Sequence, residues 1–246
     1  MNIIPKLKFE LDFNSNFGAF ILHLFEDFPG CTNYSLSLIR KSNLKKEIAK
    51  IIKQETLEDD NIFVKKLMKN PQQLKEKIPL SLFNEIYYSY LEYFNSNKNK
   101  FKLRVINIRK SFKNRNILKA LNEIPKLTMY KWKTKLIKIY FVDIYYNVND
   151  KIIEGTTTKD GIFIGLPHKP TNEFISTLFH ELIHSNLLNK YDEDNEEILA
   201  QILGIKITKL ILGKVPDQSI KIAKRRIKKI TGKDYKIIEK ELITKG

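Results

Sequence analysis

The amino-acid sequence predicts an α+β protein with a small mixed or antiparallel sheet, two neighbouring helices that carry the polar motifs, and a mostly helical N-terminal region. Three observations lead to this prediction. Apolar and polar residues alternate near the N-terminus, β-branched and aromatic residues are dense over 136–146, and helical spacing prevails elsewhere. The chain has 246 residues, 42% of them hydrophobic. This is enough for a sizeable core and excludes disordered and fibrous classes.

The N-terminal half is expected to hold one strand and several helices. Strict alternation from Leu7 to Phe13 predicts a half-buried strand. Helical spacing over 44–97 predicts two or three helices, a polar run over 95–100 predicts a loop, and a basic helix is expected over 105–123.

The C-terminal half is expected to begin with strands and end with helices. Dense apolar residues over 136–146 predict one or two strands, and Asp160-Gly161 predicts the turn of a hairpin. Thr171 or Asn172 can cap a helix that runs to about Leu188. Three further helices are expected, over about 195–212, 217–230 and 235–243.

The sequence pattern changes near Pro125, from helical spacing to a segment dense in β-branched and aromatic residues, and this change predicts two regions. Residues 1–127 form a mostly helical region of unknown role, and residues 128–246 hold the motifs that carry chemistry. The single cysteine, Cys31, excludes a disulfide framework and fits a reducing compartment. No apolar run is long enough for a transmembrane segment and no leader is visible, so a cytoplasmic protein is expected. The sequence leaves the oligomeric state open.

The net charge of +16 has two interpretations. It can be a footprint for nucleic acid or another polyanion, or it can reflect a composition in which lysine greatly outnumbers arginine. The expected helix over 217–230 allows both interpretations, because its basic side chains lie on the face opposite an apolar stripe. These side chains are candidates for nucleic-acid contact or for an ordinary solvated face: Lys221, Lys224, Arg225, Arg226, Lys228 and Lys229.

The most informative motif is His180-Glu181-Leu182-Ile183-His184. Two histidines spaced i and i+4 share one face of a helix, so both imidazoles can reach one metal ion. Glu181 lies beside the ion, where it can take a proton from metal-bound water. The motif therefore predicts a zinc site with Glu181 as the general base.

Zinc needs a third protein ligand and an open fourth position. No histidine follows His184, and Cys31 is distant in sequence, so a carboxylate from Asp192 to Glu197 is expected. Glu197 is the best candidate because its helical face also carries small residues, which allow the two helices to approach closely. Glu196 points about 100° away and is expected to be solvated.

The sequence resembles the gluzincin branch of the zincin metallopeptidases in two motifs. These are His180-Glu181-x-x-His184 and the downstream Glu197-Ile-Leu-Ala200-Gln201. The resemblance covers about residues 136–213. It implies a zincin-like catalytic part with one Zn²⁺ held by His180, His184 and Glu197, and it implies peptide-bond hydrolysis by Glu-assisted attack of a zinc-bound water on a protein or peptide substrate.

In such enzymes the substrate lies extended against an edge strand, and strand addition assigns this role to the segment after the predicted turn. Its residues are Gly161, Ile162, Phe163, Ile164 and Gly165. An oxyanion stabiliser is also needed, and Tyr191, His168, Lys190 and Tyr235 all stay open for that role.

Two other functions compete with the metalloprotease. One is a nucleic-acid-associated protein of this fold, whose main task is DNA or RNA binding with local or regulated proteolysis. The other is a degenerate zincin that acts only as an interaction module, and the retention of both histidines and Glu181 argues against it.

Overall fold

The structure is a computed structural model, and it describes residues 3–25, 70–76, 78–113, 117–143 and 155–244. Within these residues the chain is α+β, mostly helical with a small mixed sheet, as the sequence predicts. Cys31, the helices expected before residue 70 and the end of the strand expected over 136–146 lie outside the described residues.

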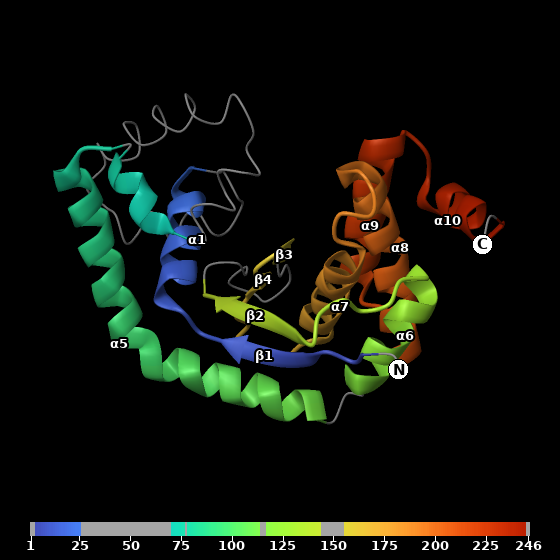
Figure 1. Cartoon of the computed structure of the whole chain (residues 1–246), viewed down its shortest axis with the longest axis horizontal. Helices are drawn as coiled ribbons and strands as arrows, with labels where there is room; N and C mark the ends of the chain where they lie inside the picture. The colour runs from blue at the N-terminus through green and yellow to red at the C-terminus, as the bar shows by residue number, and fades with distance from the viewer. Residues whose placement is uncertain (1–2, 26–69, 77, 114–116, 144–154, 245–246) are drawn as a thin grey trace.

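The sheet has four strands in the order β1-β2-β4-β3 (Figure 1). The strands are β1 (Lys6–Glu10), β2 (Leu136–Val142), β3 (Gly155–Thr158) and β4 (Gly161–Gly165). β1 and β4 both pair with β2 in parallel, whereas β3 pairs with β4 as an antiparallel hairpin. The hairpin is thus confirmed, but its two turn residues are Lys159 and Asp160, and Gly161 begins β4 opposite Thr158 with a positive φ of 146°.

The strand order corrects one prediction about the substrate. β4, which holds Gly161 to Gly165, is a central strand with partners on both sides, so it cannot accept an added strand. Among the described strands, β3 beside it forms the edge of the sheet. The prediction was wrong because strand order depends on pairing with β1 and β2, which local patterns do not reveal.

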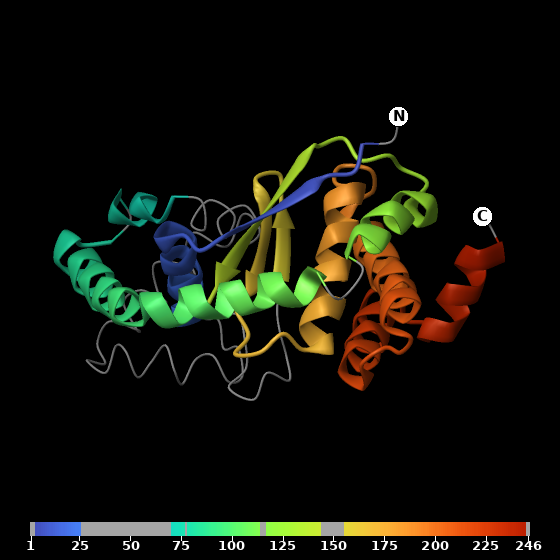
Figure 2. The ribbon, with the colours of Figure 1, turned by 90° about the horizontal axis from the view of Figure 1, so that it is seen from below.

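Helices surround the sheet at both ends (Figures 1 and 2). At one end lie α1 (Phe13–Phe25) and the 3₁₀ helix η1 (Pro71–Glu76), and the long helix α5 (Leu80–Lys113) starts there and runs along the sheet toward α6. At the other end lie α6 (Ile117–Thr128), α7 (Asn172–Leu187), α8 (Glu193–Leu212), α9 (Asp217–Thr231) and α10 (Tyr235–Thr244). The predicted helices of the C-terminal half agree with these bounds within a few residues.

Three predictions for the N-terminal half were wrong. The helix expected over 105–123 is divided between the end of α5 and the start of α6. The strand ends at Glu10, because Asp12 caps the next helix: its Oδ2 accepts a hydrogen bond of 2.7 Å from the Ser15 backbone. The polar run over 95–100 is not a loop but part of α5. Phe94 and Phe101 are both buried there, and seven residues is two helical turns, so the polar residues between them cover one exposed stretch of a continuous helix.

A buried polar cluster, made by Asp143, Arg104, Tyr93 and Asn16, closes the end of β2. Arg104 Nη1 lies 3.1 Å from Asp143 Oδ1, and the Tyr93 hydroxyl donates to Asp143 Oδ2. The Asp143 backbone N–H donates to Asn16 Oδ1 at 2.9 Å. Burial raises the pKa of Asp143, while the Tyr93 hydrogen bond and the charge of Arg104 oppose that rise.

The main core draws on both halves of the described chain, from β1 to α8. It combines residues before position 127, such as Phe17 and Tyr90, with residues after it, such as Phe141 and Phe179. The division at 127/128 stays a prediction, but the two regions share one sheet and one core. A second, smaller core joins α8, α9 and α10 and consists of Ile198, Ile202, Ala223, Ile227, Tyr235 and Ile238.

Candidate metal centre

α7 carries the two histidines and begins where the sequence predicts. Thr171 is its N-cap, with the side chain accepting a hydrogen bond of 3.1 Å from the Phe174 backbone. The apolar residues of α7 are buried against the sheet and α8, while His180 and His184 keep exposed fractions of 13% and 15%. The histidines therefore lie on the strip of the helix that borders a pocket.

α8 carries the acidic residues and packs along α7. Asp192 caps it by accepting from the Asn195 backbone at 2.9 Å, and Gly213 ends it with a positive φ of 74°. The helices approach closely at Gly204: a Cβ there would lie 3.4 Å from the Cα of His180. The small residue on the predicted face of α8 thus brings Glu197 within reach of the histidines of α7.

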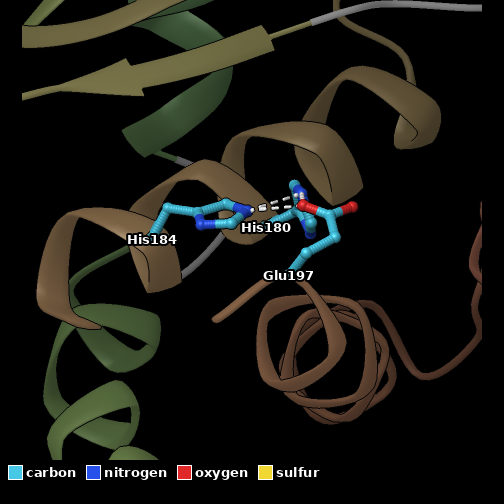
Figure 3. Close-up of side chains that lie close together, drawn as sticks. All are labelled: His180, His184 and Glu197. Atoms are coloured by element: carbon cyan, nitrogen blue, oxygen red, sulfur yellow. Dashed lines mark hydrogen bonds and ion pairs between the residues drawn. The ribbon is translucent and has the colours of Figure 1, made fainter. Parts of the chain in front are cut away.

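His180, His184 and Glu197 converge on one point from these two helices (Figure 3). His184 Nε2 lies 3.1 Å from His180 Nε2 and 3.0 Å from Glu197 Oε2, and His180 Nε2 lies 3.7 Å from that oxygen. Zinc bonds of about 2.0–2.1 Å at tetrahedral angles place donor atoms about 3.3 Å apart. The three distances fit a single ion of this size.

The hydrogen-bond chemistry of the three atoms also fits a cation. His184 Nδ1 lies 2.7 Å from Glu196 Oε1, and because a carboxylate accepts, Nδ1 carries the hydrogen. Nε2 of a neutral His184 then presents a lone pair to His180 and to Glu197. Three acceptors facing one another repel unless a proton or a metal ion lies between them.

The pKa values of the two histidines differ widely in the metal-free protein. Burial lowers the pKa of His180, and the nearby His184 lowers it further, to about 3. Burial also lowers the pKa of His184, but hydrogen bonds to Glu196 and Glu197 outweigh it and raise the pKa to about 10. Burial favours the neutral form of Glu197, yet His184, His180 and Arg226 hold its pKa well below the usual range. A proton on His184 thus supplies the positive charge.

Glu196 does not lie where the sequence analysis expected it. Its side chain is only 16% exposed, and it holds the ring nitrogen of His184 that faces away from the convergence point. A carboxylate in this position fixes the tautomer of a metal-binding histidine and orients its ring. The 100° rotation from Glu197 was predicted correctly, but it turns Glu196 toward a different atom of the site rather than toward solvent.

The predicted role of Arg226 also needs correction. It was grouped with the candidates for nucleic-acid contact, but its Nη1 donates to Glu197 Oε1 at 2.7 Å. Gln201 Nε2 donates to the same oxygen at 2.7 Å. The other five basic residues of α9 are exposed, and their contact with nucleic acid stays a prediction.

Glu181 is buried beside the three converging atoms and is held by β3. The Thr157 hydroxyl lies 2.8 Å from Glu181 Oε2, and a Cβ on Gly155 would lie 2.7 Å from Glu181 Cγ. Burial raises the pKa of Glu181, against the opposing effects of His184 and Thr157. A raised pKa makes a carboxylate a stronger base. The sequence analysis missed Thr157 and Gly155 because only the strand pairing brings them here.

A pocket opens over these residues. The edge strand β3 lines one side through Gly155, Thr156 and Thr157, and α9 lines another through Arg226 and Lys229. Of the four side chains considered for the oxyanion, only Tyr191 lines this pocket. Tyr235 belongs to the second core, His168 lies after β4, and the Lys190 ammonium lies over the ring of Tyr130.

Comparison with protein-family models, with curated proteins and with solved structures finds no match. Among the helices that the structure describes, none is long and apolar enough to cross a membrane.

Proposed function

We propose that the protein is a zinc-dependent metallopeptidase of a gluzincin-like kind. The observation that carries the proposal is the convergence of His180 Nε2, His184 Nε2 and Glu197 Oε2, all within 4.8 Å of one another, beside a buried Glu181. His180, His184 and Glu197 would hold one Zn²⁺. When bound, zinc supplies Lewis-acid chemistry, which polarises a carbonyl group and lowers the pKa of a water molecule toward neutrality.

The side chains around the site have separate roles in this proposal. Glu181 accepts the proton of the attacking water and passes it to the leaving amine, because its carboxylate is held near the three donor atoms by Thr157. Glu196 fixes the tautomer of His184 through Nδ1. Tyr191 is the candidate oxyanion donor, since it lines the same pocket.

The proposed substrate position follows the corrected strand order. A peptide in extended conformation would add to the outer edge of β3, whose residues Gly155 to Thr157 line the pocket next to Glu181. This replaces the assignment to β4. Together with HExxH on α7 and the third ligand on α8, an antiparallel edge strand beside the site supports the zincin-like arrangement that the sequence motif implies.

Metal analysis with a peptide digest tests the proposal. We expect one zinc per purified chain, the loss of that zinc in Glu197→Ala, and cleavage of a peptide library by the zinc-loaded protein only. A matched control is Asp194→Ala, which removes an exposed carboxylate from the same turn of α8. A protein that binds no zinc, or that cleaves equally well after chelation, would refute the proposed function.

A further inference from the structure

Glu197 presents its two oxygens to different partners. Oε2 faces both imidazoles, at 3.0 Å from His184 and 3.7 Å from His180. Oε1 receives two hydrogen bonds of 2.7 Å, one from Gln201 on the same helix and one from Arg226 on α9. The carboxylate is therefore held with one oxygen toward the donor cluster and the other turned away from it.

The Arg226 side chain is 47% exposed, but packing of α9 fixes the place from which it extends. Ala223 and Ile227, on either side of it in α9, are fully buried in the second core against α8. This contact determines the rotation of α9, and the rotation directs Arg226 to Glu197 and to the wall of the pocket. Arg225, one residue earlier, is exposed and lies about 100° away around the helix.

We propose that Arg226 is a positioning residue of the metal centre, which keeps Glu197 a one-oxygen ligand by holding Oε1. The inference rests on the proposed function, because it concerns a residue that acts through a metal ligand. A carboxylate that is free to rotate can bind zinc through both oxygens and occupy the position that a catalytic site keeps open. Gln201 supplies a neutral hydrogen bond to Oε1, and Arg226 adds charge to it.

Three full-length variants test the inference: Arg226→Ala, Arg226→Lys and, as the matched control, Arg225→Ala. Zinc affinity is measured by competition with a chromophoric chelator, and coordination is followed by the visible absorption of the Co²⁺-loaded protein. We expect Arg226→Ala to change the Co²⁺ spectrum toward a higher coordination number, because Glu197 can then bind through both oxygens. We expect it also to weaken zinc binding by about 10–100-fold, because the freed carboxylate must be ordered again when the metal binds and partners of metal ligands have effects of this size. Arg226→Lys should recover part of the affinity, and Arg225→Ala should match the unmodified protein.

A melting curve of each chelated protein separates positioning from a structural role. Arg226→Ala should melt close to Arg225→Ala without metal and should gain less stability when zinc is added. Equal zinc affinity and equal Co²⁺ spectra in the two variants would overturn the inference while leaving the proposed function intact. Absence of zinc binding by the unmodified protein would overturn both.

Discussion

Two buried clusters of polar side chains in this protein differ in how well their hydrogen-bond donors and acceptors match. In the cluster around Asp143 each acceptor meets a donor: Arg104 and Tyr93 donate to the carboxylate, and Asn16 accepts from the backbone. In the cluster of His180, His184 and Glu197, three acceptors point at one another instead. The first is complete with neutral and charged protein groups as they stand, whereas the second needs a positive charge between its atoms, which either a proton on His184 or a bound cation can supply. Burial of polar groups therefore marks a binding site only where donors and acceptors fail to match.

The largest effect expected is on catalysis at the His180 cluster. Glu181→Gln should keep zinc bound, because the residue lies beside the donor atoms, and should lower the hydrolysis rate by about 10²–10⁴-fold. Peptide cleavage and zinc content are measured on the same sample. Glu193→Gln, an exposed glutamate at the same pocket, is the control and should stay active. Full activity of Glu181→Gln would remove the general base from the mechanism.

A substitution in the Asp143 cluster should lower the stability of the fold and leave the zinc content unchanged. Arg104→Met leaves the buried carboxylate without its cation, so the free energy of unfolding should fall by about 3–5 kcal/mol. Urea unfolding measures this, with Lys102→Met on the exposed side of α5 as the control. Zinc loss from the folded Arg104 variant would show that the two clusters are coupled, against the comparison drawn above.

The pH dependence of zinc binding tests whether a proton occupies the second cluster. At pH 7 the metal-free His184, with a pKa of about 10, carries a proton that zinc must displace, while His180, with a pKa of about 3, carries none. Zinc affinity should therefore rise about tenfold per pH unit, or about 100-fold from pH 6 to pH 8. Titration calorimetry in buffers of different ionisation enthalpy should detect about one proton released per zinc.

The same pKa shift affects the metal-free fold in a defined direction. Because the pKa of His184 is raised from 6.5, its protonation stabilises the folded chain fully below about pH 6.5. This contribution is lost as the pH rises through about 10. A zinc affinity that does not change over pH 6–8 would mean that His184 is already neutral in the metal-free protein.

The smallest of the four effects concerns Glu196. A solvated Glu196, as the sequence predicts, would make Glu196→Ala nearly silent, but the hydrogen bond of Glu196 to His184 Nδ1 changes this expectation. We now expect a 10–100-fold loss of zinc affinity, the usual cost of removing the partner of a metal-binding histidine. Asp194→Ala, exposed on the same turn, should lose little by comparison. Equal affinities in these two variants would return Glu196 to the solvated role first assigned to it.

Local patterns predicted the parts of the site that local chemistry determines. The i and i+4 spacing placed His180 and His184 together, the Thr171 cap set the start of α7, and the facing of Glu197 followed from helix geometry. The hairpin was predicted from Asp160-Gly161, although its turn residues are Lys159 and Asp160. Each of these depends on residues close in sequence.

The features that were missed depend on contacts between distant segments. Arg226 reaches Glu197 because the second core sets the rotation of α9, and Thr157 reaches Glu181 because β3 pairs with β4 at the edge of the sheet. The interior of α5 is a different case. The seven-residue spacing of Phe94 and Phe101 indicated a continuous helix, but the run of polar residues between them was interpreted as a loop.

The pairing of β1 with β2 has a consequence for how the protein is made. Lys6 pairs with Leu136 in parallel, so β1 must wait for the synthesis of a partner strand that lies about 130 residues later in the chain. The hairpin, the histidines, Glu197 and Arg226 follow in that order. Parallel pairing over such a separation makes folding slow and leaves apolar strand surface uncovered meanwhile. If the protein binds zinc as proposed, metal capture should follow the closing of the sheet that supports α7.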